Sequence, residues 1–234
     1  MKKMFSSLLV LTAFASLSLT AQTADEIISK NIAAIGGKDV ISKVTSLYME
    51  GSMQVMGNEA PTTVTILAGK GYKSETDFNG QKSIQCYTDK GGWMVNPMAG
   101  GGAQPMPDEQ YKANREQINI AGVLSDYAAK GFSATLLGKE GNNYKIKLSD
   151  KDKTETTYYI DGTTYFVSKV ERKGNFQGQD VQIVITFADY KKTDDGLAIP
   201  RTMGMDFGQF QLTANYTKVE TNKKVDPAIF EMPK

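Results

Sequence analysis

The chain contains no histidine among its 234 residues. This absence excludes the Ser-His-Asp and Cys-His arrangements of nucleophilic catalysis and removes most zinc, iron and copper sites. Carboxylate pairs and lysine remain as catalytic groups, but no spacing in the sequence brings two of them together. We therefore expect no enzymatic activity, no cofactor and no metal.

Cysteine is nearly absent too, because Cys86 is the only one. It cannot form an internal disulfide, so the fold depends on its hydrophobic core. Cys86 alternates with Ile84 on an apolar strand face, which is typical of a buried thiol. The chain also lacks an excess of charge: 27 basic and 26 acidic residues leave a net charge of +1. Without a basic block, we expect no nucleic-acid partner.

The first 21 residues have the pattern of a secretory signal peptide. Lys2 and Lys3 precede an apolar run over residues 7–19, and small residues follow up to Ala21. The run is too short and serine-rich for a good spanning helix. No cysteine follows it, so the lipid-anchoring signal is missing. We expect cleavage near Ala21, periplasmic export without an anchor, and a single domain over residues 22–234.

Helical patterns occur in two regions of that domain, at its start and near mid-chain. Thr23 and Glu26 have capping-box spacing, and the isoleucines that follow form one apolar stripe before Gly36-Gly37. A short amphipathic piece is expected over residues 39–44. Two further helices are expected near mid-chain, over residues 108–117 and 120–130.

Elsewhere the apolar period is two, which is typical of strands. Turn signals separate these segments, and Asn79-Gly80 is the clearest two-residue hairpin signal. The pattern predicts a mainly β protein of about eleven antiparallel strands, forming a barrel or a strongly curved sheet.

Residues 97–107 interrupt the strands with a glycine-rich but apolar loop. Met94, Met98 and Met106 cluster around it, which favours a lid, although a flexible surface loop is as good an interpretation. The eleven methionines also suggest the hypothesis of a Cu(I) site, because thioethers bind Cu(I). Without histidine, flexible thioethers that adapt to apolar partners are the simpler interpretation.

Acidic pairs are the remaining candidates for chemistry. Asp194-Asp195-Gly196 is the most prominent, but adjacent strand residues point to opposite faces. Aspartate before glycine is also typical of turns. A carboxylate hydrolase therefore remains only an alternative.

The order of several short motifs resembles a known family. They are Gly36-Gly37 after the first helix, VTSLYMEG at 44–51, DKGGW at 89–93, YYID at 158–161, DGLAIP at 195–200 and VDPAIF at 225–230. Together they resemble the LolA/LolB-like superfamily of periplasmic lipoprotein carriers and outer membrane lipoprotein-sorting proteins, in its Bacteroidetes-type forms.

This resemblance implies an unclosed barrel whose helices cover an apolar cavity that accepts acyl chains. The protein would bind lipids or lipoprotein acyl chains passively, as a monomer, and exchange them with envelope donor and acceptor proteins during outer membrane biogenesis. The best-known carriers hold the lid with an arginine. No motif matches that role to Arg115, Arg172 or Arg201.

The inward-facing apolar residues of the strands are the expected cavity lining. They are Met49, Met53, Val55, Ile66, Phe78, Ile84, Trp93 and Val95 in the first half, and Ile183, Ile185, Phe210 and Leu212 in the second. Two alternatives stay open besides the hydrolase. One is an outer-membrane β-barrel, and the other is an envelope binding or structural module whose barrel is filled by side chains and takes no small ligand.

Overall fold

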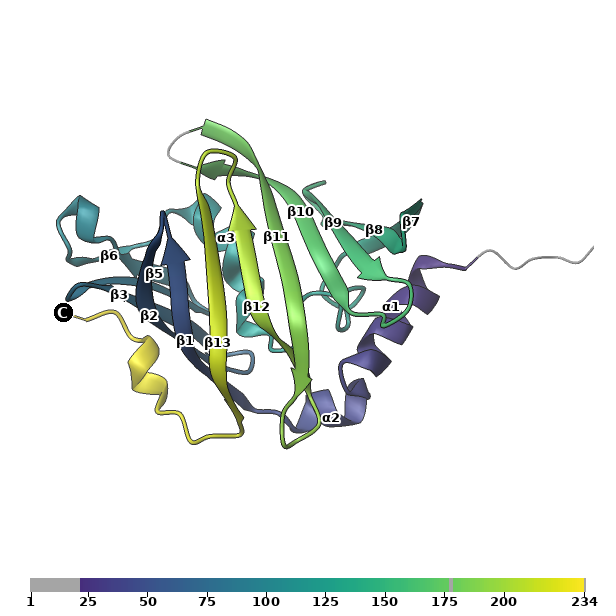
Figure 1. Cartoon of the computed structure of the whole chain (residues 1–234), viewed down its shortest axis with the longest axis horizontal. Helices are drawn as coiled ribbons and strands as arrows, with labels where there is room; N and C mark the ends of the chain where they lie inside the picture. The colour runs from purple at the N-terminus through teal and green to yellow at the C-terminus, as the bar shows by residue number, and fades with distance from the viewer. Residues whose placement is uncertain (1–21, 177–178, 234) are drawn as a thin grey trace, which may run out of the picture.

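The computed structural model describes residues 22–176 and 179–233, so the expected signal peptide lies outside the described residues. The dominant feature is one antiparallel sheet of 13 strands (Figure 1). The predicted mainly β, antiparallel architecture is confirmed, with 13 strands instead of about eleven. One additional strand, Ala103–Pro105, lies within residues 97–107, which were expected to form a loop.

The strands follow one another along the chain as two meanders. The first comprises β1 (Ser46–Val55), β2 (Asn58–Leu67), β3 (Gly71–Phe78), β4 (Gln81–Thr88), β5 (Gly92–Val95) and β6 (Ala103–Pro105). The second comprises β7 (Ser133–Glu140), β8 (Asn143–Ser149), β9 (Glu155–Asp161), β10 (Val167–Phe176), β11 (Gln179–Lys192), β12 (Ala198–Asp206) and β13 (Gln211–Thr221).

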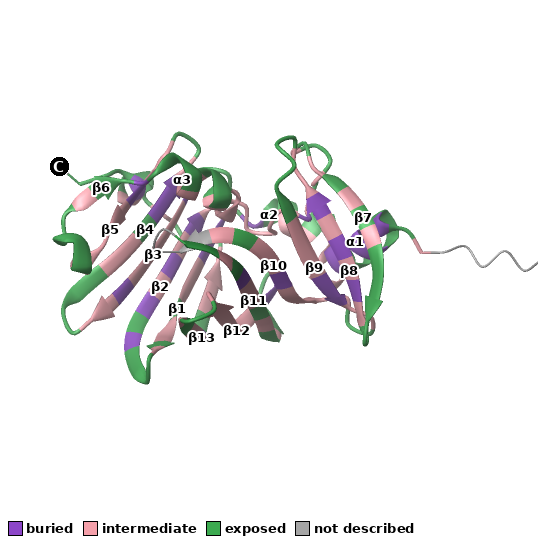
Figure 2. Ribbon diagram, turned by 90° about the horizontal axis from the view of Figure 1, so that it is seen from above, coloured by how far each residue is buried: buried purple, intermediate pink, exposed green. Residues whose placement is uncertain are grey.

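The two meanders join in the middle of the sheet, where β1 pairs with β13. Strands β6 and β7 therefore form the two outer edges, and the barrel is not closed by hydrogen bonds. The sheet curls so that these edges lie on either side of α2 (Gly37–Lys43) and α3 (Asp108–Asn114) (Figure 2). The face toward the helices is called the inner face below, and the opposite one the outer face.

Gly51 marks the junction of the two meanders. The register between β1 and β13 shifts at Glu50/Gly51, as expected for a β-bulge. A Cβ atom at Gly51 would overlap the backbone carbonyl oxygen of Asn215 on β13. Only glycine permits this close approach, so Gly51 helps to fix the register at the centre of the sheet.

The first helix, α1 (Ala24–Ala34), begins as its sequence predicts. The Glu26 amide donates to Thr23 Oγ1 at 3.2 Å, and the Thr23 amide donates to Glu26 Oε2 at 3.1 Å. The helix ends before Gly36 and Gly37, which both have positive φ. A second helix, α2 (Gly37–Lys43), leads into β1.

The insertion between β6 and β7 is less helical than expected. It contains α3 (Asp108–Asn114) and the 3-10 turn η2 (Arg115–Ile118). Residues 120–131 form successive turns, so the helix predicted over 120–130 is wrong. Gly122 and Asp126 adopt positive φ values of 70° and 56°, a conformation that an α-helix cannot contain.

Three apolar clusters pack the helices, the insertion and the C-terminal turn against the sheet. The first packs α1 against the inner face of β8 and β9 through Ile27, Ile28 and Ile146. The second lies under α2 and the insertion, around Leu47 and Val64. The third lies on the outer face, where the C-terminal 3-10 turn η3 (Pro227–Phe230) covers the first meander. In Figure 1 this C-terminal segment and α3 lie on opposite sides of the sheet.

Candidate functional site

The inner face carries a continuous apolar surface across four adjacent strands. In one row, Val55 pairs with Leu212, Leu212 with Met205, and Met205 with Ile185. In the next row, Met53, Ala214, Met203 and Phe187 are paired in the same way. We call these eight residues the apolar wall. All except Ala214 are only half-buried, so the wall remains partly accessible.

The other predicted inner residues surround this wall. Met49 and Ile66 belong to the buried cluster beneath α2, and Ile183 is buried on β11 opposite Arg172. Phe78 lies at the end of β3. Phe210 lies in the turn between β12 and β13, with its ring 6.3 Å from that of Phe207. Their contact with a ligand stays a prediction.

Three of the predicted lining residues lie on the outer face, which corrects their assignment. The Asn79-Gly80 hairpin pairs Phe78 with Gln81 and Glu75 with Ile84, so Ile84 faces away from Phe78. Ile84 pairs with Val95, which places Val95 and Trp93 on the outer face as well. A two-residue hairpin fixes this parity, so the sequence itself held the signal.

Trp93 is sealed there by the C-terminal segment. Its indole Nε1 donates to the Phe230 carbonyl oxygen at 2.8 Å, and Cys86 Sγ lies 3.4 Å from the same oxygen. Burial raises the pKa of the Cys86 thiol to about 12, so the thiol stays protonated at neutral pH. The predicted burial of the cysteine is confirmed.

The three methionines assigned to a lid do not form one. Met94 lies on β5 and pairs with Gln85, so it belongs to the sheet. Met106 is buried against Gly92, whose carbonyl oxygen accepts its amide hydrogen. Met98 is 98% exposed in the 3-10 turn η1 (Pro97–Ala99), where it covers nothing. The helical insertion, not the glycine-rich loop, lies over the inner face.

The insertion is attached to both arms of the curved sheet. On one side, the Tyr111 hydroxyl of α3 donates to the Thr88 carbonyl oxygen of β4 at 2.9 Å. On the other, the Arg172 guanidinium of β10 donates to the Ala113 carbonyl oxygen at 2.8 Å and to Asn114 Oδ1 at 2.9 Å. Arg172 therefore holds α3 in place, a role that no sequence motif identified.

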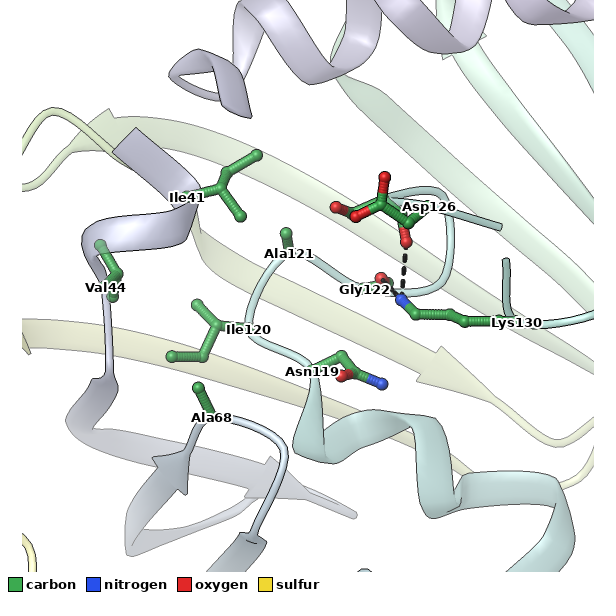
Figure 3. Close-up of a pocket in the computed structure, with 10 residues that line it drawn as sticks. Ile41, Val44, Ala68, Asn119, Ile120, Ala121, Gly122, Asp126 and Lys130 are labelled. Carbon is green, nitrogen blue, oxygen red and sulfur yellow. Dashed lines mark hydrogen bonds between the residues drawn. The ribbon is translucent and has the colours of Figure 1, made fainter. Parts of the chain in front are cut away.

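A small hollow lies between α2 and the turns of the insertion (Figure 3). Its volume is about 180 Å³. Ile41, Val44 and Ile120 form its apolar side, and Asp126 and Lys130 form its polar side. Lys130 Nζ donates to the Gly122 and Ser125 carbonyl oxygens at 3.0 and 2.7 Å. Burial lowers the pKa of this ammonium group, and these bonds fold the turn segment.

A larger hollow, of about 680 Å³, lies on the outer face beside η3. Trp93, Phe230 and Pro105 line it, together with Lys70 of the turn between β2 and β3 and Asp89 of the turn between β4 and β5. Those two side chains pair with each other at 3.8 Å. Lys90 and Glu231 are the other charged residues of the lining.

Clusters of metal-ligating side chains and membrane-spanning helices were looked for in the described parts of the chain. No group of three or more metal-ligating side chains occurs among residues 22–176 and 179–233. Within the same residues, no helix combines the length and apolar character needed to cross a membrane.

No known protein family and no curated protein matches the sequence. Solved structures do match the fold. One is a domain from Vibrio parahaemolyticus that is described as an outer membrane lipoprotein-sorting protein domain. It is 17% identical, the TM-score is 0.57, and the match covers 88% of this chain and 95% of that one. A LolA superfamily protein from Nitrosomonas europaea is 11% identical, with a TM-score of 0.59 over 90% and 98%.

A third similar structure is a DUF1329 family protein from Desulfovibrio piger, 11% identical with a TM-score of 0.53 over 90% and 98%. Identities this low establish the fold alone. The chain thus has a LolA-like fold, an open antiparallel barrel with helices on its inner face, as the motif order implied.

Proposed function

We propose that the protein is a periplasmic carrier or binder of lipids, including lipoprotein acyl chains, that acts without catalysis. The apolar wall carries this proposal, because soluble proteins rarely leave contiguous apolar surface accessible unless it binds something. Four of its eight positions are methionine or phenylalanine. Flexible thioethers adapt their shape to variable apolar ligands. The LolA-like fold of the neighbours, one of them a lipoprotein-sorting domain, agrees with this role.

Binding would be driven by removal of hydrocarbon from water. Each methylene buried contributes about 0.8 kcal/mol, so a chain of moderate length supplies enough free energy without directional contacts. The insertion governs access in this mechanism. Release of the Arg172 hydrogen bonds would let α3 move away from β10 and expose more of the inner face.

A filled module without a small ligand is the second candidate. The small size of the hollow beneath α2, about 180 Å³, favours it, because ligand pockets usually have volumes of about 300–1,000 Å³. The two candidates differ in whether the insertion moves. A carrier must move the insertion away from the inner face when the ligand enters, whereas a filled module keeps the insertion in place.

Leu212 and its neighbour Thr213 provide a matched test. Leu212 lies on the wall, and Thr213 is the next residue of β13 and faces the outer side. We expect Leu212→Asp to weaken binding of a fluorescent fatty acid by at least about tenfold, because a carboxylate would be placed against hydrocarbon. Thr213→Asp should bind like wild type. Equal binding by both variants, or no binding by the wild type, would contradict the proposal.

A further inference from the structure

Arg201, whose Nε atom is buried without a hydrogen-bond partner in the described part of the chain, lies next to the apolar wall. Arg201 lies on β12, two residues before Met203, and so shares the inner face with it. Its Nε atom is fully buried and has no hydrogen-bond partner in the described part of the chain. The guanidinium as a whole makes no hydrogen bond or ion pair with residues 22–176 and 179–233.

The surrounding residues explain why the guanidinium is unpaired. On its own strand Arg201 is flanked on the inner face by Ile199 and Met203. On β11 the facing position belongs to Asp189, between the pairs Ala188–Thr202 and Tyr190–Pro200. The Asp189 carboxylate is committed to Lys191 at 2.8 Å. Among the described residues, no ion pair joins Asp189 to Arg201.

An unpaired, partly buried cation is costly to maintain. Buried polar atoms are almost always hydrogen-bonded, and one that is not loses its hydration without compensation. Arg172, the other inner arginine of the sheet, follows the rule, because it donates to two oxygens of α3. Arginine is also the side chain best suited to carboxylates and phosphates, which it binds through two parallel hydrogen bonds.

We propose that Arg201 binds the anionic headgroup of an amphiphile whose hydrocarbon chain lies along the apolar wall. This inference rests on the proposed lipid-binding function and narrows it to ligands with a carboxylate or phosphate group. The position of Arg201 suits this role, because Arg201, Met203 and Met205 are successive residues on the inner face of β12. Arg201 therefore lies at one end of the apolar wall. The headgroup would lie toward α2 and the chain toward the end of the sheet where β12 turns into β13.

Three amphiphiles of equal chain length test the proposal by calorimetry: dodecanoate, dodecyl phosphate and 1-dodecanol. The wild-type protein should bind at least one of the anions about tenfold or more tightly than the alcohol. Arg201→Met should abolish this preference and leave the affinity for dodecanol within about twofold. Arg201→Lys should retain part of the preference, because it keeps the charge and loses the paired geometry.

The controls separate the possible failures. Lys173→Met removes an exposed cation from the outer side of β10 and should behave as wild type. Arg201→Gln replaces the methionine variant if the latter does not fold, as judged by circular dichroism.

Equal affinity of the wild type for anions and alcohol would overturn the inference alone. Inorganic phosphate binding as tightly as dodecyl phosphate would overturn it too, because the site would then recognise a free anion. Failure to bind any of the three amphiphiles would overturn the proposed function itself.

Discussion

Removal of the Arg172 side chain should loosen the insertion without unfolding the sheet. Arg172→Met keeps a side chain of similar length and deletes both hydrogen bonds to α3, at 2.8 and 2.9 Å. A hydrogen bond from a charged donor contributes about 1.5–3 kcal/mol. The two hydrogen bonds together contribute less than twice this free energy, because the bond to Ala113 is exposed and solvent competes for it.

The burial of the guanidinium reduces the net effect further. Burial lowers the pKa of Arg172, so the folded environment already disfavours its charge. We therefore expect a net loss of about 1.5–3 kcal/mol, which raises the open population of the insertion by about 10- to 150-fold. Amide hydrogen exchange followed by mass spectrometry measures this quantity directly.

The expected pattern is local. Peptides that cover residues 108–131 should exchange about tenfold or more faster in Arg172→Met, whereas those from β1, β2 and β13 should be unchanged. The variant Lys173→Met is the matched control, since it removes a neighbouring cation on the outer side of β10. Unchanged exchange in the insertion, or a uniform increase throughout the sheet, would refute the role assigned to Arg172.

Three further predictions follow from close contacts in the fold. Gly51→Ala should lower the free energy of unfolding in urea by about 2 kcal/mol or more, because its Cβ would overlap the backbone of β13. Gly91→Ala, where a Cβ meets nothing, should stay within about 0.5 kcal/mol of wild type. Phe230→Ala should cost about 3–5 kcal/mol and shift the emission of Trp93, the single tryptophan, to longer wavelength as it becomes hydrated. Because burial raises the pKa of Cys86 to about 12, its thiol should resist a thiol-specific reagent at pH 8 and react only after unfolding, and fast reaction of the native protein would contradict this burial.

The local signals in the sequence were sufficient to predict many of the elements. Thr23 and Glu26 form the capping box that their spacing indicated, and strand alternation identified the wall residues Met53, Val55, Ile185 and Leu212. The capping box and the place of these four residues on one face are confirmed, because capping and alternation depend on neighbours within a few residues, whereas their contact with a ligand stays a prediction.

The remaining features depend on contacts between distant segments. Alternation within one strand does not relate its faces to those of the next strand. Ile84, Trp93 and Val95 were therefore assigned to the wrong side, although the two-residue hairpin at Asn79-Gly80 fixes their face. The segment 120–131 has helical periodicity, but the left-handed conformations at Gly122 and Asp126 divide it into turns. The isolated position of Arg201 becomes visible only when the strands are aligned.

The central claim is that the inner face carries a bound lipid, and native mass spectrometry of the mature protein purified from its own cell envelope tests it most directly. The account predicts a stoichiometric adduct that lipid extraction identifies as an anionic amphiphile or an acylated species. Leu212→Asp should remove the adduct while the fold, judged by circular dichroism, stays intact. A bare protein mass, together with no uptake of added fatty acid or fatty alcohol, would contradict the account and favour a filled barrel without a small ligand.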